Sequence, residues 1–351
     1  MHNRRTFLAT LAAASFARAA RAADRPIAIG QIGTRHAHAA GKLATIRQFP
    51  DLFALAGVVE PDPAQRESLA KKPPYQGVSW ISEEQLLSRP DVLAVAVETH
   101  VADLVPTALR CIRAGKHIHL DKPGGASLAP FAQLLEEART RGLLVQMGYM
   151  FRYNPAFQFL FKAVKDGWLG PIREIHGVIG KMASPDMRHD LSQFPGGGMF
   201  ELGCHLIDAL LTVMGPPEKI TPFQRPSRPT QDSFQDNQVA VFEFPGAIAT
   251  LRCNHVDSFG GPRRQFQVIG ELGTIEIRPL EPPRLILMID RPRGEFAKGT
   301  HEVRLPEPGG RYDGDFRDFA AVIRKQSVFR WPPEHDRAVQ EAVLRASGMP
   351  L

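Results

Sequence analysis

Short apolar runs alternate with helix-type segments over residues 26–148, and this alternation constrains the fold more than any other feature of the sequence. The apolar runs predict strands over residues 26–33, 53–60, 92–97, 116–120 and 143–148. The segments between them predict helices over residues 36–49, 62–71, 101–114 and 128–141. Strands that alternate with helices form βαβ units around a parallel sheet, so a bundle made only of helices is excluded.

The pattern changes after residue 155, where hairpin-linked strands become more frequent than helices. Strands are predicted over residues 172–179, 237–244, 247–254, 265–269 and 274–277, and helices over 156–166, 199–214, 314–325 and 334–347. Gly270 to Gly273 predicts a hairpin connection, and residues 222–233 predict a long loop. Strands joined in this way favour a mostly antiparallel sheet. We therefore expect an α/β protein with a doubly wound parallel sheet over residues 26–150 and an α+β domain over residues 151–351.

The first 22 residues have the order of an export signal rather than that of a folded element. Arg4 and Arg5 precede an uncharged stretch over residues 6–17, and the small residues at 20–22 offer a cleavage site. The Arg-Arg-Thr-Phe-Leu core resembles the twin-arginine signal. Twelve uncharged residues are too few for a bilayer core, which needs about 20. We therefore expect a periplasmic or otherwise exported protein. The alternatives are an uncleaved amphipathic start and a membrane anchor.

Charge and cysteine content exclude several classes of partner. The formal net charge is +6, but residues 1–22 carry four arginines and no acid, so 6 − 4 leaves only +2 on the rest of the chain. A nearly neutral body gives no reason to expect a nucleic acid partner. Cys111, Cys204 and Cys253 are odd in number and widely spaced. They therefore predict neither a disulfide framework nor a zinc site.

A glycine turn joins the first predicted strand to the first predicted helix, where a doubly wound sheet binds the pyrophosphate of a dinucleotide. The turn begins Gly33-Thr34-Arg35-His36, and only its first glycine matches the pattern G-x-G-x-x-G. Glu60 ends the second predicted strand, where a carboxylate accepts hydrogen bonds from ribose hydroxyls and repels a 2′-phosphate. We expect these five residues to bind the cofactor, with NAD favoured over NADP. Arg35 either obstructs the pyrophosphate or pairs with it.

Four short motifs follow one another along the chain. Residues 98–100 read Glu-Thr-His, and residues 114–123 read Ala-Gly-Lys-His-Ile-His-Leu-Asp-Lys-Pro. Residues 148–155 read Gly-Tyr-Met-Phe-Arg-Tyr-Asn-Pro, and residues 196–208 run from a triple glycine to an aspartate. These motifs resemble the P-N-H turn, the A-G-K-H-V-x-x-E-K-P signature, the G-x-x-x-R-x-x-P crossing and the G-G-x-x-x-D-x-G-x-H-x-x-D helix of the Gfo/Idh/MocA family, which includes glucose–fructose oxidoreductase and inositol dehydrogenase. The resemblance covers residues 26–349.

The resemblance implies a Rossmann domain, an open sheet domain, a nicotinamide cofactor (NAD or NADP) and a homodimer or homotetramer. It also implies site residues, which are Lys122, His205 and Glu201 for catalysis, Thr99, His100, Asp121 and Lys122 for the cofactor, and Arg152, Tyr153, Asn154 and Asp208 for the substrate. Two departures from the pattern matter, namely Arg35 in the glycine turn and Glu201, which stands where the family has an aspartate. The added methylene shifts the carboxylate or changes the substrate geometry.

The chemistry of these residues agrees with hydride transfer on a small alcohol. Lys122 follows a predicted strand at the edge where such sheets bind ligands, and its ammonium group can stabilise a developing alkoxide. Glu201 and His205 stand four positions apart and Asp208 three positions further, so we expect all three on one helix face. His205 would then accept the hydroxyl proton while Glu201 orients its ring.

Three functions remain open on the sequence alone. The leading hypothesis is an NAD(P)-dependent oxidoreductase that acts on a sugar, a polyol or a derivative. The second is net non-redox chemistry, in which transient oxidation permits elimination or glycoside cleavage and the cofactor is regenerated in each cycle. The third, which Arg35 favours, is a carbohydrate-binding protein with a decayed nucleotide site. A tightly held cofactor fits an exported protein better than an exchanging one.

No residue pattern in the sequence predicts a metal site. His36, His38 and His100 are rich in ligand atoms, and so is the pair Cys204-His205, but none of them has the spacing of a ligand set. We therefore expect no metal.

Overall fold

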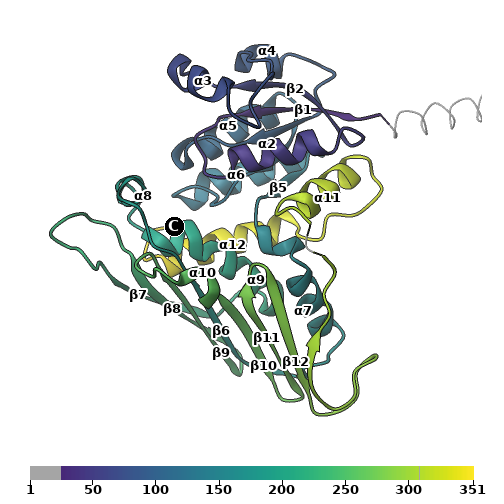
Figure 1. Cartoon of the computed structure of the whole chain (residues 1–351), viewed down its shortest axis with the longest axis vertical. Coiled ribbons are helices and arrows are strands. Elements are labelled where there is room, and N and C mark those ends of the chain that lie inside the picture. Colours follow the sequence, from purple (N-terminus) through teal and green to yellow (C-terminus); the bar gives the residue numbers. More distant parts are fainter. Residues whose placement is uncertain (1–24, 308) are drawn as a thin grey trace, which may run out of the picture.

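The computed structural model describes residues 25–307 and 309–351 and contains two β-sheets, each with its own helices (Figure 1). One sheet has five strands and the other has eight. The expected export signal over residues 1–22 lies outside the described residues. Within the described ranges, no helix combines the length and the apolar character that crossing a bilayer requires.

The first sheet is parallel throughout and has the strand order β2-β1-β3-β4-β5. Its strands are β1 (Ile27–Ile32), β2 (Phe53–Val59), β3 (Ala94–Val97), β4 (His117–Leu120) and β5 (Val145–Met147). Every residue of β3 is buried, as expected for an Ala- and Val-rich strand covered on both faces. The chain leaves β1 for β2 on one side and later returns to β3 on the other, so a topological switch point lies between β1 and β3. The predicted doubly wound sheet is confirmed.

Helices connect these strands and cover the sheet. They are α2 (Ala39–Gln48), α3 (Pro63–Ala70), α4 (Glu83–Leu87), α5 (Leu104–Arg113), which follows the short 3₁₀ helix η1 (Val101–Asp103), and α6 (Leu128–Thr140). The Asp62 side chain accepts hydrogen bonds at the start of α3, and Pro63 occupies its first position, as the sequence predicts. The first predicted helix is corrected at its start. It begins at Ala39 rather than His36, and residues 36–38 form a turn.

The second sheet is mixed, with the strand order β13-β12-β11-β10-β6-β9-β8-β7. Its strands are β6 (Ile172–Gly180), β7 (Lys219–Arg225), β8 (Asn237–Phe244), β9 (Ala247–Asn254), β10 (Gln265–Gly270), β11 (Gly273–Leu280), β12 (Pro283–Ile289) and β13 (Gly299–Val303). Only β6 and β9 pair in parallel; all other neighbours are antiparallel. The expected hairpin is confirmed by the pairing of Gly270 with Gly273. The prediction of a loop from residue 222 is wrong, because β7 continues through Arg225 as an edge strand.

The second half of the chain also contains helices. They are η2 (Met150–Tyr153), α7 (Pro155–Lys165), α8 (Pro185–Leu191), η3 (Met199–Gly203), α9 (Cys204–Met214), α10 (Gly260–Arg263), α11 (Asp313–Ile323) and α12 (Pro333–Ala346). Of these, α7, α9 and α12 contact strands of the second sheet. The helix predicted over residues 199–214 exists, but its first turn, η3, is π-helical. The alternation of buried and partly exposed residues along β8 agrees with a sheet that has only one covered face.

One helix from the end of the chain packs on the first sheet rather than on the second. In Figure 1, α11 lies beside the parallel sheet and its helix α2. Phe316 and Phe319 of α11 are buried in a cluster with Ile29 of β1 and Phe53 of β2. The range 151–351 is therefore not a self-contained packing unit, because its helix α11 packs into the core of the preceding domain.

Candidate active site

A cavity of about 580 Å³ opens at the carboxyl ends of β1 and β2, beside the switch point of the first sheet. Gly33, Glu60 and Thr99 line it, as do Arg66 and Arg110. A doubly wound sheet binds a dinucleotide at this place. Three of the predicted cofactor residues are thus brought to one cavity.

Gly33 is required where β1 and β3 approach each other. Its φ of +89° is unfavourable for a side chain, and a Cβ atom there would lie 2.6 Å from the backbone nitrogen of Thr99. The one glycine that this turn shares with the G-x-G-x-x-G pattern therefore has a steric role.

Thr34, a further predicted cofactor residue, is joined to Glu60. The Thr34 hydroxyl donates a hydrogen bond of 2.6 Å to Glu60 Oε2, and the backbone N–H of Asp62 donates one of 3.1 Å to Glu60 Oε1. These bonds fix the carboxylate at the end of β2. Arg35 is not among the residues that line the cavity. Its side chain is 53% exposed and forms an ion pair of 2.7 Å with Asp62.

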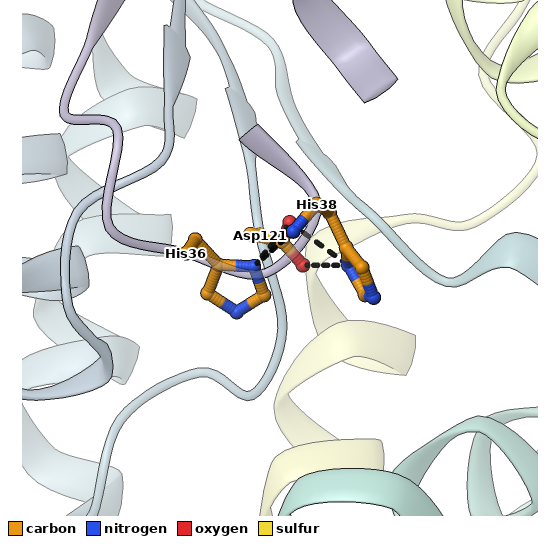
Figure 2. A group of neighbouring side chains, drawn as sticks. All are labelled: His36, His38 and Asp121. Atoms are coloured by element: carbon orange, nitrogen blue, oxygen red, sulfur yellow. Dashed lines mark hydrogen bonds and ion pairs between the residues drawn. The ribbon is translucent and has the colours of Figure 1, made fainter. Parts of the chain in front are cut away.

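Asp121, at the end of β4, is the centre of a group of polar side chains. Its Oδ2 lies 2.9 Å from His36 Nδ1, 3.1 Å from His38 Nδ1 and 2.7 Å from Lys42 Nζ (Figure 2). The Asp121 side chain is fully buried and its oxygens are all engaged. Asp121 therefore holds the turn over residues 36–38 in place, and its role in cofactor binding stays a prediction.

Lys122, the next residue, points toward the second domain. Its Nζ donates to the backbone carbonyl of Glu201 at 2.6 Å and to Glu201 Oε1 at 3.0 Å. The lysine side chain is 1% exposed. Burial, the largest single effect, lowers the pKa of Lys122, but Glu201, Cys204 and Asp121 together raise it above its usual value. These neighbours therefore favour the charged form of Lys122.

Glu201 contacts cations and not the predicted histidine. Besides Lys122, its carboxylate lies 3.3 Å from Lys181 Nζ and 3.7 Å from His255 Nε2. Burial opposes the charge, but Lys122 and the other neighbours hold the pKa of Glu201 well below its usual value. The expectation that Glu201 orients His205 is wrong. The π-helical turn η3 changes the spacing that a regular helix would give.

His205 lies at the start of α9, buried among aromatic rings. The ring centroids of Tyr149, Phe151 and His38 are 6.0, 5.7 and 6.4 Å from that of His205. Among the described residues, its Nδ1 has no hydrogen-bond partner. Burial, and then the positive charge of Lys122, hold the pKa of His205 well below its usual value. His205 is therefore a neutral imidazole near neutral pH, able to accept a proton.

The expected substrate residues bond to other groups of the protein. The Arg152 guanidinium is fully buried and forms ion pairs with Asp208, at 2.7 Å, and with Asp336. Tyr153 donates to Asp318 at 2.7 Å, and Asn154 caps the start of α7. These contacts give the residues a structural role, and their role in substrate binding stays a prediction. Asp208 also does not join His205 and Glu201.

His100 follows β3 of the first domain, and its side chain contacts the second half of the chain. Its ring stacks on Phe194 with centroids 5.7 Å apart, near the cavity residue Thr99. The sequence analysis gave no site role to Lys42, Glu98, Lys181 or His255, although all four contact the residues discussed above. Signals were present for Lys42, which stands four positions after His38, and for Glu98, which opens the motif at residues 98–100. Lys181 and His255 are brought in by tertiary contacts alone.

The three cysteines are buried and unpaired in the described part of the chain, in agreement with the expectation of no disulfide framework. The fold does create two groups of metal-type ligands that sequence spacing did not predict. One consists of His36, His38 and Asp121, and the other of Asp208, His335 and Asp336. In both groups a buried lysine or arginine already binds the carboxylates.

Comparisons with known proteins identify both halves of the chain. A model described as the oxidoreductase family, NAD-binding Rossmann fold, matches residues 27–149, and a model of the GFO/IDH/MocA C-terminal domain matches residues 157–276. Trans-1,2-dihydrobenzene-1,2-diol dehydrogenase from Bos taurus is 28% identical over 48% of this chain and 50% of its own length. The dTDP-3,4-didehydro-2,6-dideoxy-alpha-D-glucose 3-reductase of Streptomyces violaceoruber is 31% identical over 64% of this chain and 65% of its own length.

Both relatives are thus matched over less than two thirds of their length. Among solved structures, an aldose-aldose oxidoreductase from Caulobacter crescentus, complexed with glycerol, has a TM-score of 0.77 and 19% identity. That match covers 92% of this chain and 98% of the other, and it shows a common fold. Two models of one family, matching in chain order, place this chain in the Gfo/Idh/MocA family of NAD(P)-binding oxidoreductases.

Proposed function

We propose that this protein transfers a hydride between a nicotinamide cofactor and a secondary alcohol of a sugar, a polyol or a derivative. One observation carries the proposal, namely a cationic lysine and a neutral histidine that lie close together at the edge of a dinucleotide-type sheet. Burial, and then the charge of Lys122, lower the pKa of His205. The names of the relatives, a diol dehydrogenase, a sugar reductase and an aldose oxidoreductase, support this substrate class.

The two residues divide the work of alcohol oxidation. A bound nicotinamide supplies the acceptor for the hydride that leaves the carbinol carbon. His205, being neutral, takes the hydroxyl proton. Lys122 remains protonated and stabilises the negative charge that develops on the substrate oxygen. Glu201 fixes the lysine side chain through two hydrogen bonds and keeps it charged. In the reverse direction, His205 returns the proton to the carbonyl oxygen.

The cavity residues fit a dinucleotide and favour NAD. Gly33 allows close approach at the end of β1, and the fixed Glu60 carboxylate at the end of β2 matches the place of ribose hydroxyls. The carboxylate would repel the 2′-phosphate of NADP. Arg35, paired with Asp62 at the surface, leaves the cavity open. We therefore propose NAD as the preferred cofactor and a functional rather than a decayed site.

The first experiment is to denature the purified protein and identify any released nucleotide by mass spectrometry. Stoichiometric NAD would support a held cofactor. If none is released, binding of NAD in a titration, tighter than that of NADP, would support an exchanging cofactor. Failure to bind either nucleotide would contradict the proposal. A panel of sugars and polyols is then screened for NADH formation. Product formation without net NADH would point instead to non-redox chemistry through transient oxidation.

Lys122→Ala tests the division of roles. The variant should bind the cofactor like the wild type but lose turnover by about a hundredfold or more, because a preorganised charge is removed from the reacting oxygen. Lys298→Ala, at an exposed lysine far from the site, serves as the matched control. His205→Asn provides a second variant if the first does not fold. Wild-type turnover in either folded variant would contradict the assignment.

We also propose that residues 1–22 direct export through the twin-arginine pathway. The pair Arg4-Arg5 and the apolar stretch after it support this proposal. Replacing both arginines by lysine should leave the protein in the cytoplasmic fraction, whereas periplasmic recovery of that variant would contradict it.

A further inference from the structure

Glu201 lies between two lysines, and only one of them has a role in the proposed reaction. Its Oε1 accepts a hydrogen bond of 3.0 Å from Lys122 Nζ, and its Oε2 lies 3.3 Å from Lys181 Nζ. Lys181 directly follows β6, and its backbone N–H donates to the carbonyl of Asn254 on β9. The end of β6 therefore holds a second ammonium group beside the candidate catalytic residues.

Lys181 is the most exposed member of this group. Its side chain is 26% exposed, compared with 1% for Lys122 and 16% for Glu201. An ammonium group has three N–H donors. Within the described chain, Lys181 Nζ donates to Glu201 alone, whereas Lys122 Nζ donates twice. Two donors of Lys181 and one donor of Lys122 are thus available to a bound molecule.

The charges around Glu201 do not balance. Despite burial, its neighbours hold the pKa of Glu201 well below its usual value, so one negative charge faces two ammonium groups. His255, at 3.7 Å from Oε2, adds no charge, because burial lowers its pKa. The next acids, Asp121 and Glu98, face Lys42 instead. A positive charge therefore remains at a partly exposed place, where it attracts an anion.

A second carboxylate near the end of β6 is shared in the same way. Arg264 donates from Nε to the carbonyl of Gly180 at 3.2 Å, and its Nη1 lies 3.3 Å from Glu281. Glu281 also pairs with Arg311 at 2.8 Å. Two cations again meet one carboxylate, so the excess of positive charge at this end of β6 extends beyond Glu201.

A purely structural role explains Lys181 less well. Glu201 already has a counter-charge in Lys122, which also binds the backbone carbonyl of Glu201 at 2.6 Å. A second ammonium group is not needed to neutralise this carboxylate, and a partly exposed ion pair adds little stability. An anion from solution would compensate the remaining charge and accept hydrogen bonds from the donors that the protein leaves free.

We propose that Lys181 binds a carboxylate of the substrate, so that the substrate is a sugar acid or a related hydroxy acid; this rests on the proposed function for Lys122. The two ammonium groups contact different oxygens of one carboxylate, which makes them close neighbours. A small molecule whose hydroxyl oxygen contacts Lys122 can thus place its own carboxylate on Lys181. The two free donors of Lys181 match the two oxygens of that carboxylate, and a neutral sugar has no group that replaces this ion pair.

The test compares matched compounds that differ in a carboxylate. The pairs are D-glucuronate with D-glucuronamide, D-galacturonate with D-galactose, and D-gluconate with D-glucitol. Isothermal titration calorimetry with and without excess NADH measures their affinity in the absence of alcohol oxidation. We expect at least one acid to bind about tenfold or more tightly than its partner, as for a hydrogen bond to a charged group. Equal affinity within every pair, or binding of none of these compounds, would overturn the proposal.

Lys181→Met removes the charge and keeps an unbranched side chain, and Lys298→Met, at an exposed lysine, is the matched control. The ratio of acid to neutral affinity should fall toward equality in Lys181→Met and stay at the wild-type value in Lys298→Met. Lys181→Arg, which restores the charge, should restore most of the preference for the acid. Lys181→Gln is the second variant if the methionine variant does not fold. A wild-type ratio in either folded neutral variant would overturn the assignment of Lys181.

The identity of the anion and the reaction are tested separately. A hexose phosphate that binds more tightly than every acid would overturn the carboxylate in favour of a phosphate. NADH formation from neutral polyols alone, lost in Lys122→Ala, would overturn the recognition of an acid but support the proposed hydride transfer. Acids that bind through Lys181 without forming NADH would instead contradict the hydride transfer and support the recognition of a carboxylate.

Discussion

At the residue scale, burial acts on two neighbouring groups with opposite results. Burial disfavours the charged form of both Lys122 and His205, but only Lys122 has a carboxylate partner. Lys122 stays charged because Glu201 compensates it, and its charge then helps to keep His205 neutral. The sequence identified Lys122 and His205 as a pair, but their charge states depend on burial and on Glu201, which lies 79 residues from Lys122.

The neutral state of His205 predicts an unusually broad acid side of the pH profile. A proton acceptor works only while it is unprotonated, and the pKa of His205 lies well below the usual 6.5. For alcohol oxidation, kcat/KM at about pH 5.5 should therefore remain within about twofold of its value at pH 7. Measuring kcat/KM across this range on an identified substrate checks the prediction. A decline centred near pH 6.5 would show an exposed or differently placed base.

Removing the Glu201 carboxylate, the partner of Lys122, should shift the alkaline limb of the pH–activity profile. In Glu201→Gln the lysine loses the carboxylate that raises its pKa, while the burial that lowers it remains. The pKa of Lys122 must then fall, so activity should be lost at a lower alkaline pH than in the wild type. Glu271→Gln, at a surface ion pair with Arg173, is the control. An unchanged alkaline limb would mean that the charge of Lys122 does not limit the reaction.

At the element scale, α11 is the part of the chain whose position most affects the first domain. The Phe316 ring is fully buried, stacks on His119 of β4 with centroids 4.6 Å apart, and meets Phe53 of β2 at 5.8 Å. The helix itself was predictable from its apolar spacing. Its partners were not, because periodicity shows which face is buried but not against which sheet.

Phe316→Ala should therefore destabilise the dinucleotide domain although residue 316 lies far beyond it in sequence. Loss of a buried phenyl ring costs about 3–5 kcal/mol of unfolding free energy. Urea unfolding followed by far-UV circular dichroism, together with NAD binding, measures the effect. Val328→Ala, at a side chain that is 88% exposed, should change neither quantity. Equal stability of Phe316→Ala and the wild type would contradict the packing of α11.

The sequence predicted five strands of the second sheet and missed β7, β12 and β13, although buried and partly exposed residues alternate along β12. β8 and β9 agree with their predicted bounds, because both are rich in apolar and β-branched residues and are joined by a short turn. β13 is short and polar, and β7 contains a proline at an exposed edge, so neither gives a strand signal. The π-helical turn η3 was missed because five residues are too few to separate its period from that of an α-helix.

At the scale of the whole molecule, buried ion pairs join segments that are far apart in the chain. Arg152 lies at the crossing between the domains, whereas its partners Asp208 and Asp336 belong to α9 and α12. His335 adds a contact of 3.1 Å to Asp208. Sequence reasoning placed Arg152 and Asp208 at the substrate because their motifs resemble a family pattern. A motif gives residue types and order, but only the fold shows which charges neutralise each other.

Arg152→Met tests whether this ion-pair cluster is structural. The substitution leaves two carboxylates buried without their cation, so stability should fall by about 3–5 kcal/mol near neutral pH. The direction in which stability changes with pH follows from the pKa shifts of the carboxyl groups. In the wild type, Arg152 and His335 hold the pKa of Asp208 below its usual value despite burial, so stability from this group is lost as the pH falls.

In Arg152→Met the carboxyl groups keep their burial but lose the guanidinium, so their folded-state pKa values rise above the unfolded ones. The folded variant then binds more protons than the unfolded chain and gains stability as the pH falls. The difference in unfolding free energy between the wild type and Arg152→Met should therefore become smaller from pH 7 toward about pH 4. Urea unfolding at several pH values measures this difference. A folded variant with unchanged stability and a raised KM would instead restore Arg152 to the substrate site, since only direct contact with the substrate separates KM from stability in that way.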